Sequence, residues 1–422
     1  HNPPKDNGYK VYASNGAQII SPADIEIAAA IGSVGPANAV PRAADPLRHP
    51  AAKPIGPDMF EDYLREVAAS LPPVTGDRSI RIVYTAMHGV GGRFVTETLA
   101  RFGFSNVHPV ARQFEPDGTF PTVAFPNPEE PGALDLAHEL AEAIDADIVF
   151  ANDPDTDRLA VSVPTPGGVW HPLTGNQIGV LLAEFLLEYT SDGTVINSIV
   201  SSPLLGHIAR RHGATWAQTL TGFKWVCTAA LDLADAGSGD MILGFEEALG
   251  YSVGTTVRDK DGISGAAAFA VLAASAAADQ ATVLDRLADL YRVYGIWTST
   301  QVSIRREGSQ GSIEISTAMD ALRSSPPTSL AGASIVATTD FSVGAESRPR
   351  YLGATNLIEF DLGEEGRVLA RPSGTEPKLK IYVDLSGPFP ESGDWIGAEQ
   401  VLNRRAADVG HALEALLVAS MG

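Results

Sequence analysis

The stretch DIVFANDPDTDR, residues 147–158, decides the fold class. Its first four residues, Asp147 and the apolar run Ile-Val-Phe at 148–150, predict a buried β-strand. Three carboxylates follow that strand at every second position: Asp153, Asp155 and Asp157. A buried strand delivers the residues after it to the carboxyl edge of a sheet, where ligands gather in open α/β folds. The stretch therefore predicts an α/β domain with a polar site at the end of this strand.

Carboxylates with this spacing converge on one hard cation when the loop curls, and Mg²⁺ prefers oxygen ligands. We therefore expect Asp153, Asp155 and Asp157 to bind magnesium, with Arg158 beside them as a phosphate clamp. A solvated acidic turn is the alternative interpretation. An EF-hand is excluded, because the later Gly and Glu that its loop requires are absent.

Outward from this stretch the hydrophobic pattern alternates between strands and helices. On the N-terminal side we predict a strand at 80–84 and helices at 93–102 and 134–144. Downstream we predict helices at 176–190, 204–211, 262–278 and 283–293, with strands at 194–200 and 241–244. After residue 301 the pattern predicts strands at 313–316, 356–361, 367–371 and 379–383, then a helix at 396–420. Repeated α/β units followed by a separate α+β domain are therefore expected.

Length and charge narrow the class of protein. A chain of 422 residues exceeds the roughly 250–300 residues that one hydrophobic core supports, so several domains are expected. The net charge of -21 repels nucleic acid and anionic lipid, so an anionic ligand needs a local basic pocket. A single cysteine, Cys227, excludes an internal disulfide framework. With no long apolar run, we expect a cytoplasmic protein with neither nucleic-acid nor membrane partners.

Four further motifs carry candidate chemistry. RPSGTEPK at 371–378 joins basic and hydroxyl side chains to a glycine, as a phosphate cradle does, or is an ordinary turn. GFEEALGY at 244–251 holds Glu246 and Glu247, which suit sugar hydroxyls or acid/base work, although exposed glutamate pairs are common. TGFKW at 221–225 is predicted to be a loop presenting Lys224, with a core tryptophan as the alternative. VRDKDG at 257–262 offers Lys260 as an acid/base group or a solvated surface lysine.

In this order the motifs resemble the α-D-phosphohexomutase family, the phosphoglucomutases and phosphomannomutases. The chain's opening, HNPPKDNGYK at 1–10, is similar to the part of the family's phosphoserine loop that follows the serine. TGFKW, together with TAMHGVGG at 85–92, looks most like the phosphoglucomutase-2 and phosphopentomutase branch. By this resemblance we expect the nucleophilic serine immediately before His1, with the first part of domain one outside the printed sequence.

The resemblance implies a fold of three similar mixed α/β domains, the first incomplete, plus a C-terminal α+β domain around a central cleft. The expected domains are residues 1–78, 79–192, 193–298 and 299–422. The second contains the metal loop (residues 152–158), the third the sugar loop (residues 244–251) and the fourth the phosphate loop (residues 371–378). A monomer or homodimer is expected.

The resemblance also assigns roles to the site residues. Lys10 is the expected general acid/base, Lys260 is the second candidate, and His1 orients the phosphoserine. Substrate binding falls to the sugar and phosphate loops, through Gly222, Lys224, Glu246, Glu247, Arg371, Ser373, Gly374 and Thr375. The cofactors are Mg²⁺ and a sugar 1,6-bisphosphate.

The implied reaction moves a phosphoryl group between C1 and C6 of glucose or mannose phosphate through a phosphoserine and a bisphosphate. A pentose phosphate is the first alternative, because Ala248 replaces the serine that the family commonly has there. A haloacid-dehalogenase-type phosphatase with Asp153 as nucleophile and Asp155 as acid/base is less favoured, because Asp157 stands where that class has Thr or Val. The third alternative is a non-catalytic chain that binds a sugar phosphate without transferring its phosphoryl group.

Overall fold

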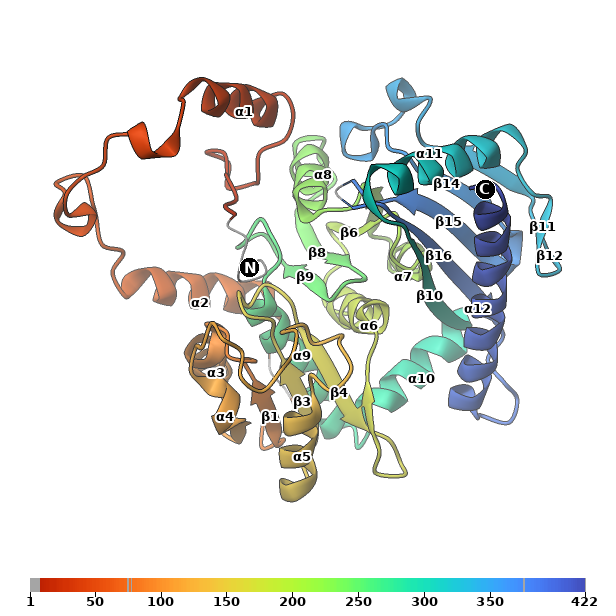
Figure 1. Cartoon of the computed structure of the whole chain (residues 1–422). Coiled ribbons are helices and arrows are strands. Elements are labelled where there is room, and N and C mark those ends of the chain that lie inside the picture. Colours follow the sequence, from red (N-terminus) through yellow and green to blue (C-terminus); the bar gives the residue numbers. More distant parts are fainter. Residues whose placement is uncertain (1–7, 74–75, 77, 375, 422) are drawn as a thin grey trace.

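The computed structural model describes the chain except for residues 1–7, 74–75, 77, 375 and 422. Within the described residues the strands form three larger sheets and one small hairpin (Figure 1). His1 and Thr375, two of the predicted site residues, lie outside the described part.

The first sheet has the strand order β2-β1-β3-β4-β5. β1, β2 and β3 run parallel, and β4 and β5 continue the sheet antiparallel. β1 and β3 are buried at every residue, which explains their unbroken apolar sequences and confirms the strands predicted at 80–84 and 147–150. The elements are β1 (Ile82–Thr85), α3 (Gly91–Arg101), β2 (Val107–Pro109), α4 (Ala111–Phe114), α5 (Asp135–Ile144), β3 (Ile148–Ala151), β4 (Ala160–Pro164) and β5 (Trp170–Pro172).

The second sheet has the order β7-β6-β8-β9, with β6 parallel to both β7 and β8. Its elements are α6 (Gly175–Leu187), β6 (Thr194–Ser198), α7 (Leu204–His212), β7 (Thr215–Thr219), α8 (Phe223–Asp235), β8 (Met241–Glu246) and β9 (Gly250–Val253). The prediction of a loop at TGFKW was wrong from Phe223 onward, because α8 begins there and buries its apolar face. Lys224 therefore lies in the first turn of a helix.

Two helices connect this region to the rest of the chain. α9 (Gly262–Ala278) and α10 (Val283–Tyr294) have nearly the predicted bounds. The small side chains of α9 let it pack closely, and it contacts both α3 and β9. In the described residues no single helix is long and apolar enough to cross a membrane. Taken together, α9 and α10 have the length and composition of a membrane span, but the two helices are bent by 88° relative to each other.

The C-terminal sheet is antiparallel throughout, in the order β10-β16-β15-β14-β13. Its elements are β10 (Ile296–Arg305), α11 (Gly308–Ser324), β11 (Ser329–Leu330), β12 (Ala333–Ser334), β13 (Ala337–Asp340), β14 (Ile358–Asp361), β15 (Gly366–Pro372), β16 (Lys378–Gly387) and α12 (Trp395–Ala419). The strand predicted at 313–316 was wrong: it lies inside α11, whose buried Ile315, Ala318, Met319 and Leu322 follow helical spacing. The predicted strands at 356–361, 367–371 and 379–383 and the final helix are confirmed.

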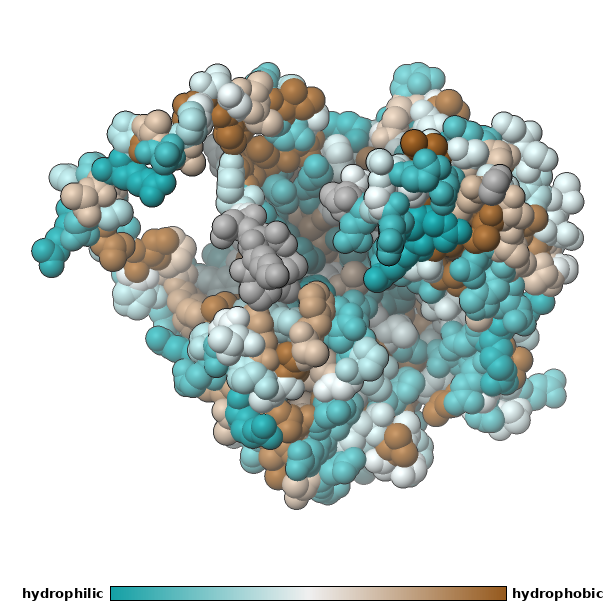
Figure 2. All heavy atoms as spheres, viewed as in Figure 1, coloured by the Kyte–Doolittle hydropathy of each residue, from teal (hydrophilic) through white to brown (hydrophobic). Residues whose placement is uncertain are grey.

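The N-terminal part forms an extended arm, visible in red and orange in Figure 1. It carries α1 (Ala23–Ser33), which has no buried residue, and α2 (Asp58–Ser70), which buries Leu64 and Val67. Figure 2 shows both hydrophobic and hydrophilic residues on the surface of the arm. The first described residues of the arm nevertheless contact the rest of the molecule, because Lys10 and Tyr12 hydrogen-bond to Asp259 near the predicted metal loop.

Candidate active site

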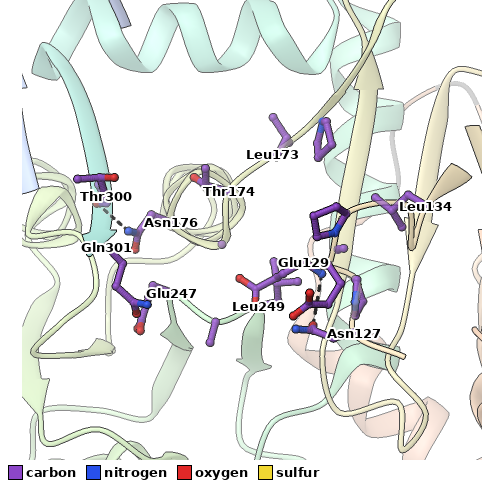
Figure 3. Close-up of a pocket in the computed structure, with 18 of the residues that line it drawn as sticks. Asn127, Glu129, Leu134, Leu173, Thr174, Asn176, Glu247, Leu249, Thr300 and Gln301 are labelled. Carbon is purple, nitrogen blue, oxygen red and sulfur yellow. Dashed lines mark hydrogen bonds between the residues drawn. The ribbon is translucent and has the colours of Figure 1, made fainter. Parts of the chain in front are cut away.

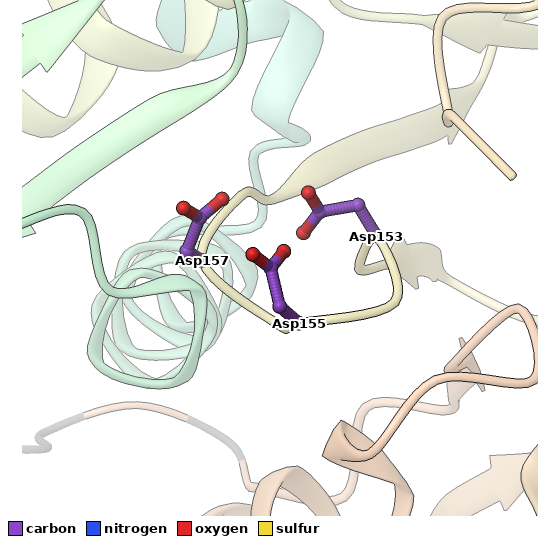
Figure 4. A group of neighbouring side chains, drawn as sticks. All are labelled: Asp153, Asp155 and Asp157. Carbon is purple, nitrogen blue, oxygen red and sulfur yellow. The ribbon is translucent and has the colours of Figure 1, made fainter. Parts of the chain in front are cut away.

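The metal loop follows β3 directly, as the sequence predicts. Asp153 is buried, Asp157 is half-buried and Asp155 is exposed, and one oxygen of each lies within 4.8 Å of the others (Figure 4). Thr156 takes the left-handed conformation at φ 65°, a rare state for a β-branched residue that turns the chain back on itself. The loop is held from outside by hydrogen bonds from Val90 N–H to the Pro154 carbonyl at 2.9 Å and from Gly262 N–H to the Thr156 carbonyl at 3.1 Å.

The electrostatics of this loop fit a divalent cation. Burial, with further repulsion from Asp157 and Asp155, raises the pKa of Asp153 from 3.8 to about 6. Arg158 opposes this shift, because its Nε lies 2.6 Å from one oxygen of Asp153 and its backbone N–H donates to the other at 3.0 Å. Three carboxylates brought this close favour a bound cation that neutralises them, and an all-oxygen donor set suits Mg²⁺.

Both predicted acid/base lysines meet the metal loop at Asp157. Lys260 Nζ lies 2.9 Å from Asp157 Oδ2, and Lys10 Nζ lies 3.4 Å from the same atom. Asp259 completes the cluster, at 3.4 Å from each lysine. Burial lowers the pKa of Lys260, but Asp157 and Asp259 more than offset it and raise that pKa to about 12. Lys260 is therefore protonated at neutral pH.

The paired glutamates lie at the end of β8, on the sugar loop. Glu246 Oε1 accepts a hydrogen bond from Gly222 N–H at 2.7 Å, which joins two predicted sugar-binding segments. Burial, and then repulsion from Glu247, raise the pKa of Glu246 to about 7. Glu247 accepts from Ser201 Oγ at 3.1 Å and from Ser198 Oγ at 3.3 Å, and burial raises its pKa as well.

The metal and sugar loops are joined through their backbones. Leu159 N–H donates to the Leu249 carbonyl at 3.0 Å, and Arg158 and Gly250 form an isolated antiparallel bridge. Two loops predicted from separate domains therefore form one surface.

A cavity of about 840 Å³ lies next to these loops (Figure 3). Its walls come from the first sheet's loops, the sugar loop and the C-terminal sheet, so it lies where three domains meet. The polar residues that line it include Asn127, Glu129, Asn176, Glu247, Gln301, Lys378, Lys380, Tyr382 and Asp384.

The predicted phosphate loop connects β15 to β16. Arg371 is half-buried at the end of β15, and Gly374 is exposed. Ser373 N–H donates to the Lys378 carbonyl at 2.7 Å, which closes the turn. Lys378 also lines the cavity, so the loop borders the same space as Glu247. Lys224 lies apart from these contacts, with Nζ 5.4 Å from the centre of the Trp225 ring.

Three residues that line the cavity were not predicted from the sequence. Lys380 and Tyr382 share one face of β16 with Lys378, and strand alternation in KLKIY was the available signal. Asn127 accepts a hydrogen bond from Arg158 Nη1 at 3.0 Å, yet it lies in a proline-rich loop with no local signal for a site.

Family models match along the chain. The models described as phosphoglucomutase/phosphomannomutase alpha/beta/alpha domains I, II and III match residues 1–36, 61–167 and 174–294. The model of the C-terminal domain matches residues 336–386.

Curated relatives match over nearly the whole chain. A probable phosphomannomutase of Haemophilus influenzae is 41% identical over 405 residues, which cover 94% of this chain and 78% of the relative. A phosphopentomutase of Mus musculus is 36% identical over 416 residues, covering 92% and 66%. A phosphoglucomutase of Staphylococcus epidermidis is 32% identical over 397 residues, covering 92% and 72%.

Solved structures show the same fold. A putative phosphomannomutase from Thermus thermophilus has a TM-score of 0.57 at 21% identity, with 83% of this chain and 66% of that chain covered. A Paramecium phosphoglucomutase in its open form has a TM-score of 0.58 at 19% identity, covering 83% and 63%.

Proposed function

The chain belongs to the phosphoglucomutase/phosphomannomutase family and is by that membership a phosphosugar mutase; from this premise we propose that it moves a phosphoryl group between C1 and C6 of glucose or mannose phosphate. The observation that carries the proposal is the meeting of Lys10, Lys260 and the three aspartates at one loop, joined by backbone hydrogen bonds to the loop of Glu246 and Glu247. A sugar 1,6-bisphosphate is the proposed intermediate. We also propose the division into domains at residues 78, 192 and 298.

The metal role falls to Asp153, Asp155 and Asp157. When bound there, Mg²⁺ supplies charge neutralisation for a transferring phosphoryl group. Asp153 has both oxygens hydrogen-bonded to Arg158, which favours a ligand role over the nucleophile role that the phosphatase alternative requires.

The proton role falls to the two lysines. Lys260 carries its proton at neutral pH, because Asp157 and Asp259 raise its pKa, and it is proposed to donate that proton to the oxygen that leaves the phosphoryl group. Lys10 lies on the more exposed side of the same cluster and is the proposed partner for the reverse direction. The proposed nucleophile is the serine that the resemblance implies immediately before His1.

The binding roles divide between two loops. Glu246, Glu247, Gly222 and Lys224 form the proposed sugar-binding group, with Glu247 facing the cavity. Arg371, Ser373, Gly374 and Thr375 are proposed to hold the phosphate that does not react. Closing this loop over the cavity excludes water and protects the phosphoenzyme from hydrolysis.

A pentose phosphate is the second candidate substrate. Two observations favour this second substrate. Ala248 lines the cavity without a hydroxyl group, and relatives named phosphopentomutase are 36% identical to this chain.

The test measures isomerisation of glucose 1-phosphate, mannose 1-phosphate and ribose 1-phosphate with Mg²⁺ and a trace of sugar bisphosphate, alongside calorimetric binding of each. Turnover of a hexose phosphate supports the main proposal, and turnover of ribose 1-phosphate alone supports the second. Lys260→Met should abolish turnover, while Lys53→Met, at an exposed position on the arm, should not. Binding without turnover supports the non-catalytic alternative, and absence of both overturns the proposal.

A further inference from the structure

Glu129 lies in the proline-rich loop between α4 and α5, and its side chain lines the cavity. The side chain is exposed to the cavity space, and Figure 3 shows it across the cavity from Glu247. In the described part of the chain no lysine or arginine forms an ion pair with it. The carboxylate is hydrogen-bonded to the Asn127 side chain, and its two oxygens keep further lone pairs that can accept hydrogen bonds from a ligand.

Glu129 is within electrostatic reach of the metal loop, the sugar loop and strand β16. Arg158 of the metal loop, Glu247 of the sugar loop and Lys380 of β16 each influence its carboxylate. The surrounding walls partly desolvate it, and this burial raises its pKa. Partial desolvation strengthens the hydrogen bonds that a carboxylate forms with a ligand, even where the side chain stays accessible from the cavity.

The backbone of Glu129 is held in place by the metal loop. Asn127 Oδ1 accepts from Arg158 Nη1 at 3.0 Å and from Glu129 N–H at 3.3 Å. Pro126 and Pro128 are both buried and restrict the loop on either side of Asn127. The carboxylate is therefore presented by a rigid segment tied to the proposed phosphate clamp, which is what a specificity-determining group requires.

We propose that Glu129 is a third sugar-binding carboxylate, which accepts hydrogen bonds from hydroxyls on the side of the sugar opposite Glu247. This inference rests on the proposed mutase function. Its negative charge repels phosphate, whereas Lys378 and Lys380 on β16 attract it, so a sugar phosphate is oriented with hydroxyls toward Glu129. Glu129 thereby supplies polar recognition in a cavity where Ala248 contributes only a methyl group.

The test compares calorimetric binding of glucose 1-phosphate with binding of its monodeoxy analogues. Glu129→Gln should weaken binding of glucose 1-phosphate by about tenfold, because a charge-assisted hydrogen bond becomes a neutral one. For the analogue that lacks the contacted hydroxyl, the substituted and unsubstituted proteins should bind equally. Glu139→Gln, the same charge change at an exposed position on α5, should leave every affinity unchanged.

Equal binding of all these sugars by the Glu129→Gln and unsubstituted proteins would overturn the inference. A uniform loss across every analogue would also overturn it, because it would indicate general disruption of the loop. An unfolding temperature of the Glu129→Gln protein equal to that of the unsubstituted protein confirms that the fold is intact. If the unsubstituted protein binds no sugar phosphate, the mutase function itself fails, and that result is separate from a failure of Glu129.

Discussion

Asp157 belongs to the proposed metal-binding group and also contacts Lys10 and Lys260, which both contact Asp259 as well. It contacts Lys260 at 2.9 Å and Lys10 at 3.4 Å while contributing an oxygen to the metal group. A cation bound by this group competes with both lysines for the same carboxylate, so binding of metal and the position of the proton donors are coupled.

Magnesium should stabilise the fold through this loop. At about 100 times its dissociation constant a ligand raises the free energy of unfolding by about 2.7 kcal/mol, and Asp155→Asn should remove most of that gain. The gain should shrink as the pH falls from 7 to 5, because protons compete for Asp153, whose pKa is about 6. Thermal unfolding with and without Mg²⁺ measures it. Asp192→Asn, an exposed site away from the loop, should keep the full effect.

Glu246 should make the stability of the protein without substrate depend on pH. Its pKa rises from 4.5 to about 7 on folding, so its contribution is fully present below pH 4.5 and is lost as the pH rises through 7. Glu246→Gln should remove a penalty on the order of 3 kcal/mol at pH 8 and change little at pH 4. Denaturant unfolding at the two pH values tests this. The exposed Glu391→Gln should show no such difference between pH values.

At the scale of elements, the start of α6 sets the place of the sugar loop. Thr174 caps α6 with a capping box, and Gly175 follows where the helix meets that loop. A Cβ at Gly175 would lie 1.9 Å from the Glu247 carbonyl oxygen, which no side chain can occupy. The close approach of helix and loop therefore requires glycine.

Gly175→Ala should push the sugar loop away from α6. We expect a loss of about 2 kcal/mol in unfolding free energy, together with weaker binding of glucose 1-phosphate. Gly32→Ala in α1 is the matched control, because open space surrounds that position and alanine favours the helix. Equal stability and sugar binding in the Gly175→Ala and unsubstituted proteins would contradict this account of the loop.

For the whole molecule, Arg367 connects the C-terminal sheet to the sugar-binding region. Its Nε pairs with the buried Asp384 at 2.9 Å, and its Nη1 lies 3.2 Å from Glu359. Its Nη2 donates to the Ser201 carbonyl at 2.7 Å, and Ser201 in turn donates to Glu247. One guanidinium therefore joins two domains behind the cavity.

Arg367→Met should destabilise the protein by about 3–5 kcal/mol, because it leaves the buried carboxylate of Asp384 without its cation. Denaturant unfolding measures this loss. Arg405→Met provides the comparison, since its pair with Glu365 is exposed on both sides and should contribute under about 1 kcal/mol. Similar losses of unfolding free energy in the two variants would contradict the claim that the buried ion pair of Arg367 stabilises the fold more than an exposed pair does.

The sequence by itself determined the elements whose burial is continuous. β3 and α9 were predicted because unbroken apolar or small residues leave few alternatives for a buried strand or helix. It also predicted that Asp153, Asp155 and Asp157 lie close together, because three alternate carboxylates after such a strand share one edge of the sheet. The strand predicted at 313–316 failed because the alternation of Ile313 and Ile315 with polar residues was given more weight than the helical spacing of Ile315, Ala318, Met319 and Leu322, which α11 buries.

Only the tertiary structure decided which distant residues share the site. Lys10 and Asp157 are 147 positions apart, and nothing local in either segment specifies their 3.4 Å contact. The cavity brings Glu129 opposite Glu247 and Lys380 because three sheets pack around it, and long-range packing leaves no local pattern in the chain. Periodicity reports the burial of each element, whereas the choice of partners depends on how separately formed faces fit together.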